Sequence, residues 1–184
     1  MTYYINSAQA EASEKITGVL RKCIRHHDRF WSEIVFLCIG SDRIIGDCLG
    51  PFVGQLLASC KASGIFVYGT LQNPVHALNL EETSRYIHLH HPGSLVIAID
   101  ASLGQKKHLG YVTIDNGSLY PGAAVHKELP PVGDIHITGI VNISGALAQL
   151  TLQTTRISTV ISLADTIARG LLPILHASDP MQTL

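Results

Sequence analysis

A short apolar run that ends in a glycine-rich turn constrains this sequence more than any other feature. Residues Ile34–Ile39 are all apolar, as in a strand that is buried on both faces of a sheet. The turn that follows, Gly40–Gly50, contains two aspartates, and Pro51 then opens a helical run. In open α/β sheets, a buried strand, a sharp turn and a helix N-terminus form a binding crevice at the carboxyl ends of the strands. We therefore expect Asp42 and Asp47 to lie at such a crevice.

The rest of the chain alternates between strand-like and helix-like segments. Further strands are expected near 65–69, 94–101, 109–115 and 135–141. Helices are expected over 8–28, 52–60, 79–91 and 144–176, the last with a break near 154–155. This alternation predicts an α/β fold: a three-layer α/β/α sandwich with a mostly parallel central sheet, in which the strand at 109–115 is antiparallel or at an edge.

The totals indicate a single globular domain. The chain has 184 residues, of which 46% are hydrophobic and 15% charged, and this composition excludes a disordered protein. We expect an N-terminal helical extension or outer-layer helix over 1–30, one α/β domain over 31–176 and a tail over 177–184. A net charge of −1 disfavours a nucleic-acid partner. Without a signal-peptide pattern or an unbroken apolar run of about 18 residues, we expect a cytoplasmic protein with no membrane partner.

A third aspartate, Asp100, ends the most strand-like run of the sequence. If its strand neighbours the one before the turn, Asp47 and Asp100 point into one crevice. Two carboxyl groups in a partly apolar site cannot both be charged cheaply, so their pKa values separate and give one acid and one base. The structural alternative is that Asp47 caps the helix that Pro51 opens, while Asp100 binds loop amides. Cys48 is expected to be a packed thiol, and no GxSxG, HExxH or P-loop motif is present.

The ten histidines raise the question of a metal site. A cluster at a helix end is expected to be solvated, namely His88, His90 and His91. His126 and His136 flank a glycine- and proline-rich segment, and either could complete an Asp/Asp/His site. A lone histidine without ligand spacing is more often structural, so this remains an alternative.

Four segments in order resemble the YyaC family of spore-forming bacteria. They are 40–51, 98–101, 120–127 and 129–142, and the likeness runs from about residue 30 to residue 170. More distantly, the layout is similar to the germination protease that degrades small acid-soluble spore proteins, and to the hydrogenase maturation endopeptidases. The resemblance implies an α/β/α fold with acidic residues at two strand ends. Asp47 matches the first of these residues, and Asp100 matches the second.

The resemblance implies a sporulation-associated endopeptidase in which Asp47 and Asp100 are the catalytic pair. Asp42, Lys127 and Asp134 are expected to bind substrate around the crevice, where the Lys127 ammonium would keep one carboxylate ionised. The segment 121–134 is expected to cover the crevice as a flap. The expected partner is a protein or peptide, with small acid-soluble spore proteins as one candidate, in the cytoplasm of the forespore or mother cell.

No metal or other cofactor is expected in this interpretation, and no oligomeric state is predicted. Two alternatives stay open. The first is a non-catalytic spore protein that binds peptides on the same fold. The second is a metal-dependent peptidase of the maturation type that uses His126 or His136, although no match to the metal-contacting histidine of the hydrogenase maturation peptidases can be assigned.

Overall fold

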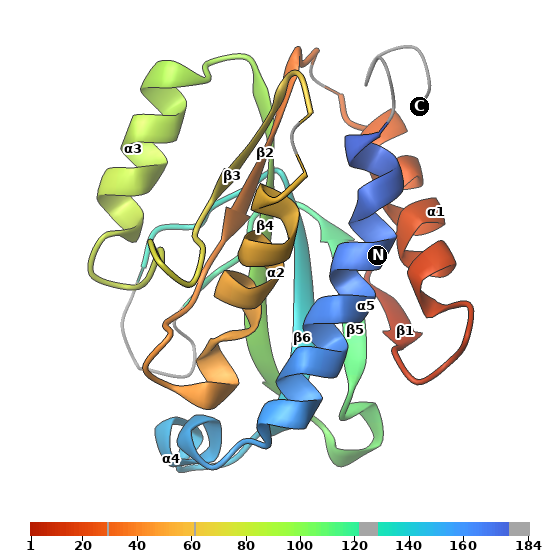
Figure 1. Ribbon diagram of the computed structural model, residues 1–184, viewed down its shortest axis with the longest axis vertical. Helices are drawn as coiled ribbons and strands as arrows, with labels where there is room; N and C mark the ends of the chain where they lie inside the picture. Colours follow the sequence, from red (N-terminus) through yellow and green to blue (C-terminus); the bar gives the residue numbers. More distant parts are fainter. Residues whose placement is uncertain (29, 61, 122–128, 177–184) are drawn as a thin grey trace.

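The computed structural model describes residues 1–28, 30–60, 62–121 and 129–176, and the statements below refer to these residues. A six-stranded sheet runs through the centre of the molecule (Figure 1). In spatial order its strands are β1 (Tyr3–Asn6), β5 (Tyr111–Asn116), β6 (Ile135–Ile143), β4 (Ser94–Gly104), β2 (Glu33–Cys38) and β3 (Ile65–Tyr68).

The sheet is mostly parallel, as the sequence predicted. The four strands β6, β4, β2 and β3 are parallel to one another. β5 is antiparallel to β6, and β1 is antiparallel to β5. The strand expected at 109–115 is therefore antiparallel, but it lies inside the sheet because β1, which was not predicted, takes the edge. The predicted adjacency of the strands that lead to the two aspartates is confirmed, since β2 and β4 pair directly.

Helices cover both faces of the sheet, which confirms the three-layer architecture. They are α1 (Ala12–Arg25), α2 (Leu49–Ala58), α3 (Leu80–His90), α4 (Ala148–Gln153) and α5 (Ile157–Leu175), with short 3₁₀ turns η1 (Ile45–Asp47) and η2 (Lys106–His108). In Figure 1, α3 lies on one side of the sheet, and α1, α2 and α5 lie on the other. The break predicted near 154–155 separates α4 from α5.

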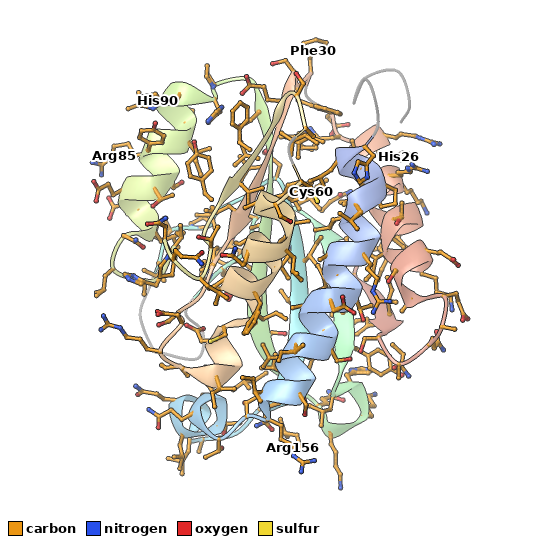
Figure 2. All side chains as sticks on the ribbon, viewed as in Figure 1. His26, Phe30, Cys60, Arg85, His90 and Arg156 are labelled. Carbon is orange, nitrogen blue, oxygen red and sulfur yellow. The ribbon has the colours of Figure 1, made fainter. Side chains whose placement is uncertain are left out.

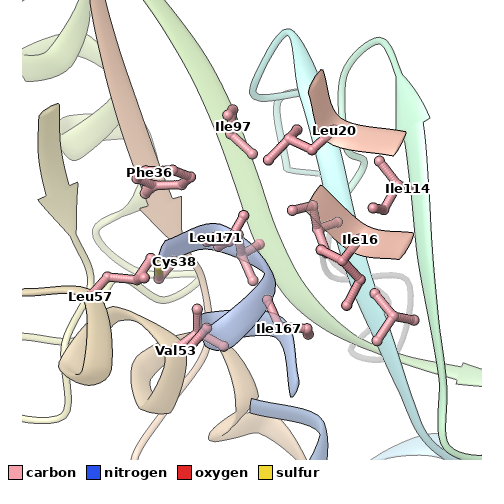
Figure 3. Packing of buried hydrophobic residues seen from close by; sticks show 14 of the residues in the cluster. Ile16, Leu20, Phe36, Cys38, Val53, Leu57, Ile97, Ile114, Ile167 and Leu171 are labelled. Carbon is pink, nitrogen blue, oxygen red and sulfur yellow. The ribbon is translucent and has the colours of Figure 1, made fainter. Parts of the chain in front are cut away.

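The two-sided core explains why β2 is apolar at every position after its first residue. Ile34, Phe36 and Cys38 face the layer of α1, α2 and α5, whereas Val35 and Leu37 face the layer of α3. Figure 3 shows the larger core, in which Leu and Ile side chains of the helices pack between Phe36 and the other strands. A strand that is buried on both sides needs apolar residues on both of its faces.

The N-terminal segment, expected as an extension or an outer-layer helix, contributes β1 to the sheet and α1 to the core. Tyr3 and Ile5 of β1 pair with β5, and Ile16 and Leu20 of α1 are fully buried against the sheet and α5. The outer-layer alternative therefore describes α1. The sequence pattern missed β1 because four residues are too few for a recognisable alternation.

α5 is long and apolar enough to cross a membrane by length and composition alone, although the sequence contains no unbroken apolar run of that length. Half of the relevant window is buried inside the protein, where α5 packs against α1, α2 and the sheet. A core helix of a globular domain has these same properties.

The chain reverses its direction of travel across the sheet between β2 and β4. From β2 it passes through α2 to β3 on one side, and α3 then carries it back across β2 to β4 on the other side. Because α2 and α3 lie on opposite faces, a crevice opens at the carboxyl ends of β2 and β4. β4 continues to Gly104, three residues beyond the predicted end at Ala101, so Asp100 lies within the strand.

Candidate functional site

The turn after β2 folds back tightly against the strand that precedes it. A side chain at Gly40, whose φ is +144°, would overlap the main-chain carbonyl of Asp47, and one at Gly50 would overlap the carbonyl of Ile39. The Ser41 N–H donates a hydrogen bond to the main-chain carbonyl of Asp47 at 3.1 Å. Glycine at these two close approaches therefore lets the turn hold Asp47 beside the end of the strand.

Asp100 is buried in β4, directly after the last residue that pairs with β2. Its Oδ1 accepts a hydrogen bond from the Ala101 N–H at 2.7 Å. Across the sheet it pairs with Thr138, whose hydroxyl bonds to Ser102 at 3.1 Å and to Thr113 at 2.7 Å. A cluster of hydroxyl groups therefore lies on the strands next to the buried carboxyl group.

Both carboxyl groups line one cavity of about 680 Å³, which is within the size range of ligand-binding sites. The cavity lies between the turn after β2, the part of β4 that extends beyond β2 (residues 100–103), the loop before α3, and α4. Its apolar wall includes Ile39, Ile44, Ala77, Leu78, Leu103, Leu119, Leu129 and Leu152, and its polar groups include Ser41, Arg43, Asp47, His76, Asp100, Ser102, Thr138 and Ser144. The structure therefore brings Asp47 and Asp100 together at the switch point of the sheet.

Burial raises the pKa values of both carboxyl groups, and the charge of Asp47 raises that of Asp100 further. Burial raises the pKa of Asp47, while the Ser41 N–H and the charge of His76 act in the opposite direction. Burial raises the pKa of Asp100 well above its usual value, the charge of Asp47 raises it further, and only the Ala101 N–H opposes this rise. Asp47 is therefore the group that ionises first, and Asp100 is the group that retains its proton.

His76 is a cavity residue that the sequence interpretation did not single out. Its Nδ1 accepts the Leu78 N–H at 3.3 Å, and its main-chain N–H donates to Asn79 Oδ1 at 2.8 Å, so the loop before α3 is fixed by hydrogen bonds. An isolated β-bridge between Val75 and Ile39 attaches this loop to the end of β2. The available signal was that His76 follows the carboxyl end of a third parallel strand, β3, where binding loops of such sheets are found.

The three residues expected to bind substrate, Asp42, Lys127 and Asp134, differ in where they lie relative to the cavity. Asp42 is exposed and does not line the cavity, where Arg43 takes its place. Lys127 and half of the predicted flap, residues 122–128, lie outside the described residues, although Leu119, Tyr120 and Leu129, on either side of that gap, line the cavity.

Asp134 lies at the opposite end of the sheet from the cavity. Its Oδ2 accepts the Val96 N–H at 2.9 Å near the beginning of β4, four residues before Asp100 and so about 13 Å away along the strand. β6 begins only at Ile135, so the Asp134 side chain supplies the hydrogen bond that a longer β6 would give. This corrects the expected substrate-binding role to a structural one.

The histidines that suggested a metal site do not join the aspartates. His136 is bonded to the Gly117 carbonyl at 2.9 Å and does not line the cavity, and His126 falls outside the described residues. Within the described part of the chain, no group of three or more His, Cys, Asp or Glu side chains is arranged to hold a metal ion. Cys48 packs in the turn as expected, with its thiol near the Ser41 and Ile44 carbonyls, and burial raises its pKa.

The histidine cluster at the end of α3 is only partly solvated. His88 and His90 are exposed, and His90, labelled in Figure 2, lies along α3 with its Nδ1 2.9 Å from the Tyr86 carbonyl. His91 is instead held between two partners, because its Nδ1 lies 2.8 Å from Glu33 Oε2 and its Nε2 lies 2.8 Å from the Tyr68 hydroxyl. This corrects the expectation for His91, which joins the end of α3 to the edge of the sheet.

Comparison with known proteins finds similarities that cover most of the chain. A crystal structure of the [NiFe] hydrogenase maturation protease HycI from Thermococcus kodakarensis is 18% identical, with a TM-score of 0.49, over 84% of this chain and 99% of that one. The uncharacterized protein YyaC of Bacillus subtilis is 44% identical over 168 residues, which are 91% of this chain and 81% of YyaC. The family model described as "Protein of unknown function (DUF1256)" matches residues 4–170. The chain therefore belongs to the DUF1256 family.

Proposed function

We propose that this protein is an endopeptidase that hydrolyses peptide bonds with Asp47 and Asp100. One observation carries the proposal: a carboxyl group in the turn after β2 and one in the neighbouring strand β4 line a single cavity, and the charge of Asp47 raises the pKa of Asp100. Carboxyl groups whose environments separate their pKa values can serve as a base and an acid. The apolar wall of the cavity would exclude water around the substrate and strengthen these interactions.

Asp47 is assigned as the base and Asp100 as the acid. The ionised Asp47 accepts a proton from water, whose oxygen attacks the carbonyl carbon of the peptide bond and forms a tetrahedral intermediate. The protonated Asp100 donates its proton to the amide nitrogen, the C–N bond breaks, and a carboxylic acid and an amine leave. Asp47 then holds a proton and Asp100 is ionised, so proton exchange restores the starting state. His76 favours the ionised form of Asp47 that the first step requires.

We further propose a protein or peptide substrate and a place in sporulation. The support is the family resemblance of the motifs around Asp47 and Asp100, which extends to the germination protease. Small acid-soluble spore proteins are one candidate substrate, and the cytoplasm of the forespore or mother cell is the corresponding location.

The decisive experiment is to incubate the protein with spore-extract proteins and to map new chain ends by mass spectrometry. Asp47→Asn and Asp100→Asn should each lower cleavage by a factor on the order of a hundred or more, while both variants stay folded. Asp115→Asn is the matched control, because Asp115 binds the N-terminus and lies outside the cavity.

The same experiment separates the alternatives. Cleavage that persists in either cavity variant would exclude the aspartate pair. Loss of cleavage on adding a chelator would indicate the metal-dependent peptidase instead. Binding of peptides without any cut would support the non-catalytic peptide-binding protein.

A further inference from the structure

β4 is longer than the strand beside it. The pairing of β2 with β4 ends at Cys38 and Ile99, after which the Ile39 N–H makes one more hydrogen bond, to the Ile99 carbonyl at 2.7 Å. β4 then continues to Gly104, paired with β6 alone among the described residues. Residues 101–104 therefore have one open edge, about 10 Å long, in the position that a longer β2 would occupy.

The backbone groups on this open edge follow from the alternation of the strand. Because the Ile99 carbonyl faces β2, the N–H and C=O groups of Ala101 and Leu103 face the same side, whereas those of Asp100 and Ser102 face β6. The Ala101 N–H is already bonded to Asp100 Oδ1 at 2.7 Å. Among the described residues, the Ala101 carbonyl and the Leu103 N–H are left as an adjacent acceptor and donor, and the Leu103 carbonyl follows them as a second acceptor.

This open edge borders the cavity that holds the aspartate pair. Residues 101–103 are half-buried and line the same cavity as Asp47 and Asp100. Ala148 and Leu152 of α4 contribute apolar surface to the cavity wall. A chain segment seated in the cavity would therefore meet both the strand edge and the two carboxyl groups.

We infer that the open edge of β4 binds the substrate as an added parallel strand, an inference that rests on the proposed peptidase function. One peptide residue donates its N–H to the Ala101 carbonyl and accepts the Leu103 N–H, as one residue does in a parallel ladder. An antiparallel pair at Ala101 would need the N–H that Asp100 already holds. Strand addition draws its affinity from main-chain bonds, so the substrate is a protein with an extended, flexible segment.

The direction of the added strand fixes where the cut falls. In a parallel pair the peptide runs from Asp100 towards Gly104, so the bond next to Asp100 lies on the N-terminal side of the paired residue. The residues that pair with β4 are therefore those that follow the cleaved bond.

The test uses a library of random-sequence, end-capped decapeptides and the Asp47→Asn/Asp100→Asn double variant, which would bind peptides without cutting them. The tightest binder is then made again with an N-methyl group at each position in turn. Methylation of the paired residue should weaken binding about three- to tenfold, because it removes one hydrogen bond. The next residue should tolerate methylation and the one after it should not, since only every second N–H faces β4.

Two protein variants give a second measurement. Leu103→Pro removes the donor on the open edge and should weaken binding about as much as one methyl group, whereas Leu103→Ala keeps the N–H and controls for the loss of the side chain. Circular dichroism reports whether Leu103→Pro stays folded, and the methyl series on the peptide tests strand addition even if it does not.

The outcomes distinguish this inference from the proposed function. If N-methylation weakens binding at every second residue but the unmodified protein cuts no peptide, strand addition is supported and the proposed peptidase function is refuted. Cleavage with uniform sensitivity, or with none, would keep the peptidase and overturn strand addition. A sensitive segment that precedes the cut would overturn the parallel direction, and failure of all library peptides to bind would overturn the inference.

Discussion

Replacing Asp100 with Asn is expected to stabilise the protein at neutral pH and to abolish its activity. Burial, reinforced by the charge of Asp47, raises the pKa of Asp100 well above its ordinary value of 3.8. The folded state therefore favours the protonated carboxyl group, whereas the unfolded chain ionises freely. Asn has nearly the same shape, carries no charge, and can still accept the Ala101 N–H through its amide oxygen.

The sign and size of the effect follow from proton linkage. The contribution of Asp100 to the free energy of unfolding is fully present below pH 3.8. It falls as pH rises towards the raised pKa of Asp100, and above that pKa the loss is constant. Each unit by which the pKa is raised costs about 1.4 kcal/mol of unfolding free energy. A gain on the order of 1 kcal/mol or more in the variant would raise Tm by about 2–4 °C per kcal/mol for a chain of this length.

Urea unfolding of both proteins from pH 3 to pH 8 measures this difference directly. The two curves should meet at the acid end and separate as pH rises. In the Asp47→Asn background the separation should shrink, because one source of the raised pKa has been removed. A variant that is less stable than the native protein by the same amount at every pH would refute the reasoning, since Asp100 would then be a structural hydrogen-bonding group.

Three further predictions test residues around the site and away from it. His76→Asn keeps an acceptor for the turn amide but loses the charge that favours ionised Asp47, so the acid limb of kcat/KM should move to higher pH while the free energy of unfolding changes by less than about 0.5 kcal/mol. Asp134→Ala should lower the free energy of unfolding by about 1–3 kcal/mol through the unpaired β4 amide, with kcat/KM unchanged. Tyr68→Phe should lower it by about 1 kcal/mol, measured by urea unfolding, because the hydroxyl partner of His91 is lost.

The sequence predicted the layers, the parallel centre of the sheet and the adjacency of the two aspartate-bearing strands. These features depend on local patterns: a strand such as β2 that is apolar on both faces, and glycines in the turn that follows it. Asp47 and Asp100 could be singled out because both follow apolar runs. That they share one cavity depends also on the path of the chain, which α3 carries back across β2 to β4. Short-range sequence patterns do not encode this path.

The misassigned residues depend on contacts between distant parts of the chain. Asp134 looked like a crevice residue because it ends a glycine- and proline-rich segment, but it bonds to an amide 38 residues earlier at the far end of the sheet. His76 was missed because its importance comes from the bridge that attaches its loop to β2. His91 is held by Glu33 and Tyr68, which come from two strands, and helix periodicity cannot reveal such contacts.

The position of the N-terminal segment has a consequence for how the chain can fold during synthesis. α1 packs closely on α5, where the Thr17 hydroxyl bonds to the Gly170 carbonyl at 2.7 Å, and β1 pairs with β5, with Tyr3 opposite Ile114. At ribosomal rates of about 5–20 residues per second, α1 is made roughly 7–30 s before the helix that covers its apolar face. The packing of α1 is thus completed late, and its apolar stripe stays exposed on the nascent chain, where it can aggregate, until α5 has been made.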